Sequence, residues 1–170
     1  MPRAAFGQVT RMLRALLRGA TAGAAATTAL NAVTYLDMVM RGRPASEMPE
    51  QAVEKLAADT GVDMPGEGEF REHRVEGLGP LLGIATGVGL GVAAATVRPL
   101  LVRLPPLIGA AVVGGGAMAA SDLPMTRLGL TDPKQWSPAD WASDVLPHLA
   151  YGLVTVGVLR QLGDRRSGGE

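Results

Sequence analysis

Four long stretches with few or no charged residues constrain this chain of 170 residues more than any other feature. A helix needs about 20 predominantly apolar residues to cross roughly 30 Å of hydrocarbon. Four helices of this kind in so short a chain would leave little surface for water. The sequence therefore predicts an all-α integral membrane protein, a four-helix bundle with spans at about 19–40, 77–97, 104–121 and 138–160.

The composition favours close packing of these helices inside lipid. The chain has 23 glycines but only 4% aromatic residues, which is few for the core of a soluble domain. In lipid, helices associate by van der Waals contact, and small side chains let their backbones approach. The spans and their connections form one membrane domain over 19–162.

Charge and residue usage exclude several classes of function. The 16 basic and 16 acidic residues balance, so no net field recruits nucleic acid. The absence of cysteine excludes disulfides and thiolate ligands. No sequence spacing typical of a nucleophile with its histidine, and no phosphate-binding glycine loop, is found. We therefore expect no catalysis, no cofactor and no metal site, and the sequence does not identify a small-molecule ligand.

Basic residues gather in three of the regions outside the spans. The N-terminal segment 1–18, the connection 98–103 and the tail 163–170, counted with Arg160, hold nine basic residues and two acids. The outer loop 41–76 is acidic, as is the connection between the third and fourth spans. Positive residues near span ends favour the cytoplasm. Both termini are therefore predicted to be cytoplasmic.

The outer loop contains a predicted short amphipathic helix. It runs from about Glu50 to near Gly61, with Val53, Leu56 and Ala57 on one face. This helix is expected to lie over the mouth of the bundle. The alternative is a docking surface for a membrane-protein partner.

The fourth span has a clear start signal. Ser137 can cap the helix, Pro138 suits its first position, and Asp140 lies three residues after the cap. Trp136 and Trp141 are expected to anchor this end at the membrane interface, where amphipathic rings accumulate.

A glycine ladder in the second span is the most regular pattern in the chain. A spacing of four residues places its members on one helical stripe that another backbone can approach closely. Small residues that could pack against this stripe are Gly115 in the third span and Gly19 and Gly23 in the first. The expected role is packing among the first three spans, with a homo-oligomer seam as the alternative. The ladder consists of Gly79, Gly83, Gly87 and Gly91.

A set of polar residues collects toward the predicted outer ends of the spans. Asp144 and His148 are four residues apart in the fourth span and share a helix face, with Tyr151 one turn further on. Ionisable groups inside a membrane are costly and usually face a partner or a wet cavity. The complete candidate polar or proton site is Asp144, His148, Tyr151, Asn31, Tyr35, Asp37 and Asp122.

Three interpretations of this set remain open. Asp144 and His148 can pair with each other and bond to Asn31 or Tyr35, locking the fourth span against the first. The set can instead line a vestibule that moves a proton or a substrate, because histidine titrates near neutral pH. Binding of a divalent metal is the third interpretation, for which one histidine with scattered carboxylates is a weak signature.

Three segments resemble uncharacterised small four-span inner-membrane proteins of high-GC, actinobacterial-type bacteria. They are Arg41-Gly42-Arg43-Pro44-Ala45-Ser46, Ala120-Ser121-Asp122-Leu123-Pro124-Met125 and the segment Trp141–Gly152. The last is also distantly similar to the His-x-x-Tyr/Phe-Gly stretch of YagU-type inner-membrane proteins. The resemblance implies a multi-pass protein of the bacterial plasma membrane and implies no activity or ligand.

Together these features favour a small polytopic inner-membrane protein with a structural or accessory role. Its expected partners are the lipid bilayer and a second copy or another membrane protein. The alternative is a proton- or cation-linked small transporter or channel that uses the outer Asp/His cluster.

Overall fold

The computed structural model describes residues 2–164, and every regular element in that range is helical. The all-α prediction is confirmed. Residues 2–164 form six α-helices and one short 3₁₀ turn, η1 (Pro133–Gln135). The helices are α1 (Pro2–Arg41), α2 (Met48–Thr60), α3 (Glu69–Thr96), α4 (Arg98–Leu101), α5 (Pro106–Arg127) and α6 (Pro138–Asp164).

In the described part of the chain three helices, α3, α5 and α6, are long and apolar enough to cross a membrane, as expected for a membrane protein. Helix α1 has the length but is not among the three. Its uncharged part, residues 19–36, consists largely of alanine, threonine and glycine and contains Asn31, so its mean hydropathy is low. The hydropathy of α1 therefore does not show whether it crosses a membrane, and its packing against the other helices is the relevant observation.

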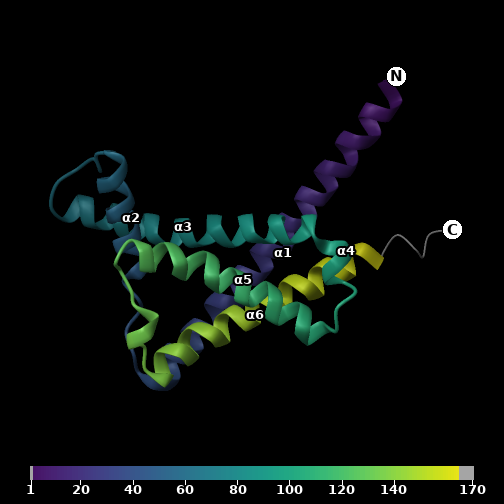
Figure 1. Cartoon of the computed structure of the whole chain (residues 1–170). Coiled ribbons are helices and arrows are strands. Elements are labelled where there is room, and N and C mark those ends of the chain that lie inside the picture. The colour runs from purple at the N-terminus through teal and green to yellow at the C-terminus, as the bar shows by residue number, and fades with distance from the viewer. Residues whose placement is uncertain (1, 165–170) are drawn as a thin grey trace.

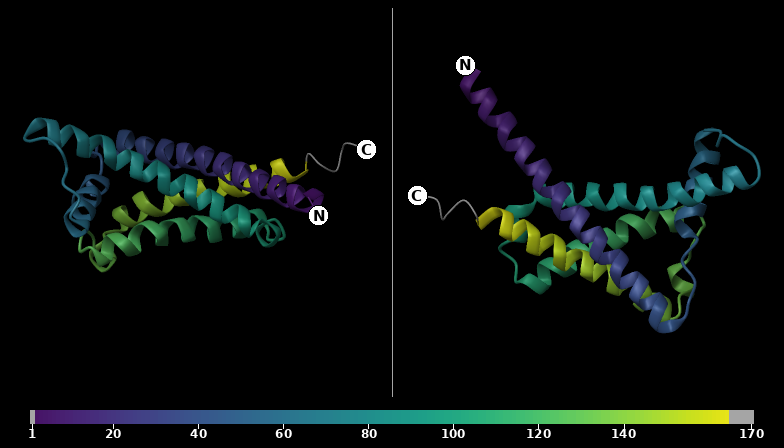
Figure 2. Two further views of the ribbon diagram at one scale, coloured as in Figure 1. Left: turned by 90° about the horizontal axis from the view of Figure 1, so that it is seen from above. Right: turned by 180° about the vertical axis from the view of Figure 1, so that it is seen from behind.

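The four long helices form an open row in the order α3–α1–α6–α5 (Figures 1 and 2). Helix α1 packs along both α3 and α6, and α5 packs along α6, whereas α3 touches α5 and α6 only sparingly. The core between them is built mostly from alanine. Fully or nearly fully buried positions include Ala22, Ala26, Ala110 and Ala117. Small side chains at these positions bring the helix axes close together.

The first and the last described residues lie at the same end of the helix bundle. In Figure 1 the start of α1, the short helix α4 and the end of α6 are all on the right. The connections α1–α3 and α5–α6 are on the left, together with α2. The four long helices therefore alternate in direction along the chain.

Two helices are longer than the predicted spans that they contain. Helix α1 is continuous from Pro2 through the basic segment 1–18, and its first turns project beyond the other helices (Figure 1). Helix α5 continues past Asp122, the predicted end of the third span, to Arg127. A left-handed Gly129 (φ 73°) ends it, with bonds from Gly129 N to Thr126 O and from Leu130 N to Met125 O.

The predicted start of a helix at Pro138, with Ser137 as its cap, is confirmed. The Asp140 carboxylate accepts hydrogen bonds from the Ser137 backbone N (2.9 Å) and hydroxyl (2.7 Å), while Asp140 N donates to the Ser137 hydroxyl (3.2 Å). This reciprocal pattern is a capping box. Trp136 and Trp141 flank it, edge to face, with ring centroids 5.0 Å apart.

The predicted outer-loop helix is present as α2, and a left-handed Gly61 ends it. It packs on the first half of α3. Its buried residue is Ala52. Val53, Leu56 and Ala57 line an open apolar groove against α3, with Leu78, Leu81, Leu82 and Ala85 on the other wall. Helix α2 therefore packs against α3 at the end of the bundle where α1 and α3 are connected (Figure 1).

The glycine ladder of α3 is divided among different neighbours. A β-carbon at Gly91 would collide with the backbone of Gly19 and Gly23 in α1, and one at Gly87 with the hydroxyl of Thr27. Gly79 faces the start of α2 instead, where a β-carbon would lie 3.1 Å from the backbone N of Glu50. The prediction that glycines join the first two spans therefore fits the geometry at Gly87 and Gly91.

Gly83 and Gly115 do not have the close contact expected of them. A β-carbon at either position would meet no atom within 4 Å in the described part of the chain. In α5 the contact is made by the preceding residue, Gly114, whose β-carbon would lie 2.5 Å from the carbonyl oxygen of His148. Gly152 of α6 lies at this same contact between α5 and α6, where its β-carbon would collide with the backbone of Ala110 and Gly114.

Candidate functional site

Asp144 and His148 form a pair on one face of α6. His148 Nδ1 lies 3.3 Å from Asp144 Oδ1 and 2.8 Å from the Asp144 backbone oxygen. Two acceptors on one side of the ring favour the tautomer that carries its proton on Nδ1. The side chains are 14% and 23% exposed. The predicted contact between these two residues is therefore present, in a largely buried position.

Helix α5 brings Asp122 and Ser121 to this pair. The Asp122 carboxyl lies within side-chain hydrogen-bonding reach of the Asp144 carboxyl and close to His148. The Ser121 hydroxyl lies 3.2 Å from Asp122 Oδ1 and 3.5 Å from His148 Nε2. Asp122 reaches the cluster because α5 continues past it, so that its side chain projects from a helix face. We call Asp122, Asp144 and His148 the carboxyl–imidazole cluster.

Ser121, which the sequence did not place near a histidine, completes the residue types of a catalytic triad with His148 and Asp144. The geometry does not support this chemistry. The serine hydroxyl donates to Met118 O at 2.9 Å, and Asp122 lies directly beside it. Ser121 sits inside α5, where backbone N–H groups are used by the helix, so no donor pair is available for an oxyanion. A neighbouring carboxylate would oppose that negative charge.

Asp37 lies in a separate group at the end of α1. Its Oδ2 accepts hydrogen bonds from Arg41 (2.7 Å), Arg43 (2.6 Å) and the Ser143 hydroxyl (3.2 Å). Arg41 also donates to Ser143 and to the Ala139 carbonyl. Asp37 thus joins the end of α1 to the start of α6. Its two arginines satisfy it, so it does not take part in the carboxyl–imidazole cluster.

The other three candidates lie outside the cluster. Tyr35 is 60% exposed on the outer surface of α1. Asn31 is half-buried and, like Tyr35, makes no hydrogen bond to Asp144 or His148 among the bonds found in residues 2–164. Tyr151 is fully buried in the core, and its hydroxyl donates to Gly87 O of α3 at 2.6 Å. The expected lock between α6 and α1 through Asn31 or Tyr35 is therefore not formed.

Tyr151→Phe is expected to lower the free energy of unfolding by about 1 kcal/mol, because it removes a buried bond between α6 and α3. Tyr35→Phe is the matched control, since its side chain is exposed, and no change is expected there. Unfolding in mixed micelles with rising dodecyl sulfate, followed by circular dichroism, measures both variants. Equal effects would show that the Tyr151 bond does not stabilise the fold.

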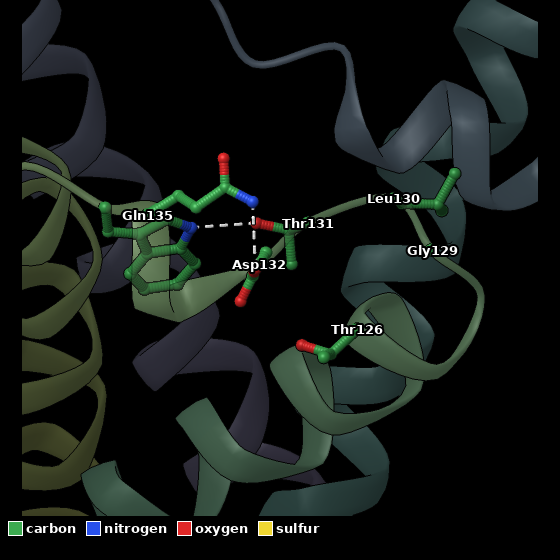
Figure 3. A pocket seen from close by; sticks show the side chains of 7 residues that line it. Thr126, Gly129, Leu130, Thr131, Asp132 and Gln135 are labelled. Atoms are coloured by element: carbon green, nitrogen blue, oxygen red, sulfur yellow. Dashed lines mark hydrogen bonds between the residues drawn. The ribbon is translucent and has the colours of Figure 1, made fainter.

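A second polar feature is a shallow pocket of about 550 Å³ between the end of α5 and the loop that leads to α6 (Figure 3). Hydrogen bonds from the Gln135 side chain (2.9 Å) and the Lys134 backbone N (3.1 Å) lower the pKa of the Asp132 carboxyl. Trp136 Nε1 donates to the Thr131 hydroxyl at 2.8 Å. These polar groups bind one another and hold the loop in shape. The lining residues are Thr126, Gly129, Leu130, Thr131, Asp132, Gln135 and Trp136.

Within residues 2–164, no three histidine, aspartate or glutamate side chains are placed so that they could hold a metal ion. The pocket before α6 and the groove between α2 and α3 are both lined by residues outside the carboxyl–imidazole cluster. Comparison with known proteins gave no match, neither to a family model, nor to a curated protein, nor to a solved structure.

Proposed function

We propose that the chain is a four-span protein of the bacterial inner membrane, with α1 as the fourth span beside α3, α5 and α6. The packing of α1 carries this proposal. Gly19 and Gly23 bring its backbone against α3, and Asp37 ties its other end to α6 through Ser143. Helices α3 and α6 are long and apolar enough to cross a membrane, and a helix that packs along both of them is expected to cross with them.

The same arrangement supports an orientation with both termini in the cytoplasm. The start of α1, α4 and the end of α6 lie together (Figure 1). Arg11, Arg14 and Arg18 come from the first of these, Arg98 from the second and Arg160 from the third. The opposite end carries the acidic outer loop. Basic residues near span ends are retained in the cytoplasm.

The role that fits this geometry best is structural or accessory, without catalysis. In the outer half, Asp37 binds two arginines and Asp144 contacts His148, so both groups join neighbouring turns or helices. Below them the helices meet through glycine, alanine and the buried Tyr151. The bilayer is the first partner of such a protein.

Labelling of single cysteines tests the topology, because the natural chain contains no cysteine. In intact cells, a membrane-impermeant maleimide is expected to label Glu67→Cys and Lys134→Cys. Gln8→Cys and Leu100→Cys should react only after the membrane is permeabilised. Labelling of Gln8→Cys in intact cells, with Leu100→Cys protected, would show that α1 does not cross and would refute the four-span proposal.

A proton- or cation-linked transporter is the second candidate function. The observation that favours it is the carboxyl–imidazole cluster, because two helices bring three ionisable groups together inside a membrane domain. Such groups often belong to proton relays. This candidate requires that protons reach the cluster from one side of the membrane.

A further inference from the structure

The carboxyl–imidazole cluster contains more acid than its neighbours neutralise. Asp122 and Asp144 lie side by side, and His148 contacts Asp144. Asp144 Oδ2 is buried and has no hydrogen-bond partner in the described structure. A buried carboxylate oxygen without a donor is costly, and a second carboxylate beside it adds repulsion. The site thus lacks one hydrogen-bond donor.

The surrounding helices do not provide this donor. On α1, both Arg41 and Arg43 bind Asp37, and the exposed Arg127 lies beyond Asp122 near the end of α5. Helix α3 has no charged residue from Gly77 to Thr96. His148 is therefore the one basic side chain in direct contact with the pair of carboxyls among residues 2–164.

The charge of the cluster indicates that the missing hydrogen-bond donor is a proton. With both carboxylates ionised, the cluster carries −1 if His148 is protonated and −2 if it is neutral. One further proton on a carboxylate oxygen supplies an O–H donor for the other carboxyl. That proton replaces the repulsion between Asp122 and Asp144 by a hydrogen bond across the α5–α6 interface. With a protonated His148 the cluster is then neutral, the state that a membrane domain tolerates best.

We propose that Asp122, Asp144 and His148 form a proton-binding site in which the two carboxyl groups share one proton between α5 and α6. A hydronium ion from the aqueous phase transfers the proton: one of its O–H bonds breaks, it leaves as water, and a new O–H bond forms on a carboxylate oxygen. Binding of the proton stabilises the outer half of the α5–α6 contact. The existence of the site does not depend on the orientation of the protein. That the proton enters from the outer side rests on the proposed four-span topology.

Infrared spectroscopy of the full chain in lipid nanodiscs tests the proposal. A protonated carboxyl has a C=O stretch that an ionised one lacks. At a pH at which exposed aspartates and glutamates are ionised, the natural protein is expected to retain this band. Asp122→Asn and Asp144→Asn should each abolish it, because either change removes the partner with which the proton is shared. His148→Gln should keep the band, because the repulsion between the carboxyls remains.

Asp132→Asn is the matched control, since this loop carboxylate is exposed and already bonded to Gln135, and it should leave the band unchanged. Asparagine is similar in size to aspartate, and circular dichroism verifies that each variant is helical. Absence of the band from the natural protein, or its survival in both Asp122→Asn and Asp144→Asn, would refute the site. Loss of the band on addition of Na⁺ or Zn²⁺ would show that the cluster binds a cation instead.

A second measurement separates this proposal from the topology. In vesicles with uniformly oriented protein, the band should respond to the pH on the side where Glu67→Cys is labelled. A response to the pH on the opposite side would leave the proton site intact and would refute the proposed route of entry.

Discussion

Replacement of Gly152 by alanine is expected to separate α6 from α5 and to lower the free energy of unfolding by about 1–3 kcal/mol or more, the usual cost of overpacking a well-packed contact. A β-carbon at this position would overlap the carbonyl oxygen of Ala110 and lie 2.8 Å from the backbone N of Gly114. Both atoms belong to the backbone of α5, so neither can rotate away as a side chain would. The two helices would have to move apart.

Gly157→Ala is the matched control, five residues later in the same helix. Its β-carbon would meet no atom within 4 Å in the described structure. Alanine is also the better helix former, by roughly 0.5–1 kcal/mol. This variant should therefore be as stable as the natural chain or slightly more so. Unfolding in mixed micelles compares the two, and equal losses of stability would contradict the close contact at Gly152.

Local sequence patterns predicted the elements of this fold well. The capping box at Ser137 and Asp140 and the amphipathic helix that ends at Gly61 both depend on residues close together in the chain, and both are present. The end of helix α5, in contrast, was not predicted. Asp122 was interpreted as the boundary of the apolar stretch, but a helix can leave the hydrocarbon without ending. The glycine that does end it, Gly129, lies seven residues further on.

The contact between α5 and α6 could not be predicted in the same way. Three consecutive glycines, 114–116, give no helical phase, so Gly115 and Gly114 were equally compatible with the sequence. The partner decides between them, and His148 and Gly152 select Gly114. Gly152 has no glycine within four residues on either side in α6, so it belongs to no repeat that the sequence shows.

Only the part of the candidate polar site that lies within one helix could be predicted from the sequence. Asp144 and His148 are four residues apart, so their contact follows from helix geometry. Asp37 and Arg41 are also four residues apart in one helix. Their ion pair engages Asp37, which therefore takes no part in the cluster. The approach of Asp122 depends on how α5 lies on α6. No local pattern contains that information.

Replacement of Gly91 by alanine is expected to destabilise the protein by about 1–3 kcal/mol or more, because its β-carbon would overlap the backbone of Gly23 and Gly19 where α3 crosses α1. Gly83→Ala is the control from the same ladder, and it should be neutral or slightly stabilising, because its β-carbon points into open space.

The pair of variants distinguishes packing within one chain from a seam between two copies. If the whole ladder faced a second copy, both variants would disrupt the dimer, and analytical ultracentrifugation in detergent would detect it. A loss of stability confined to Gly91→Ala, with no change in mass, is the result expected from the α1–α3 crossing.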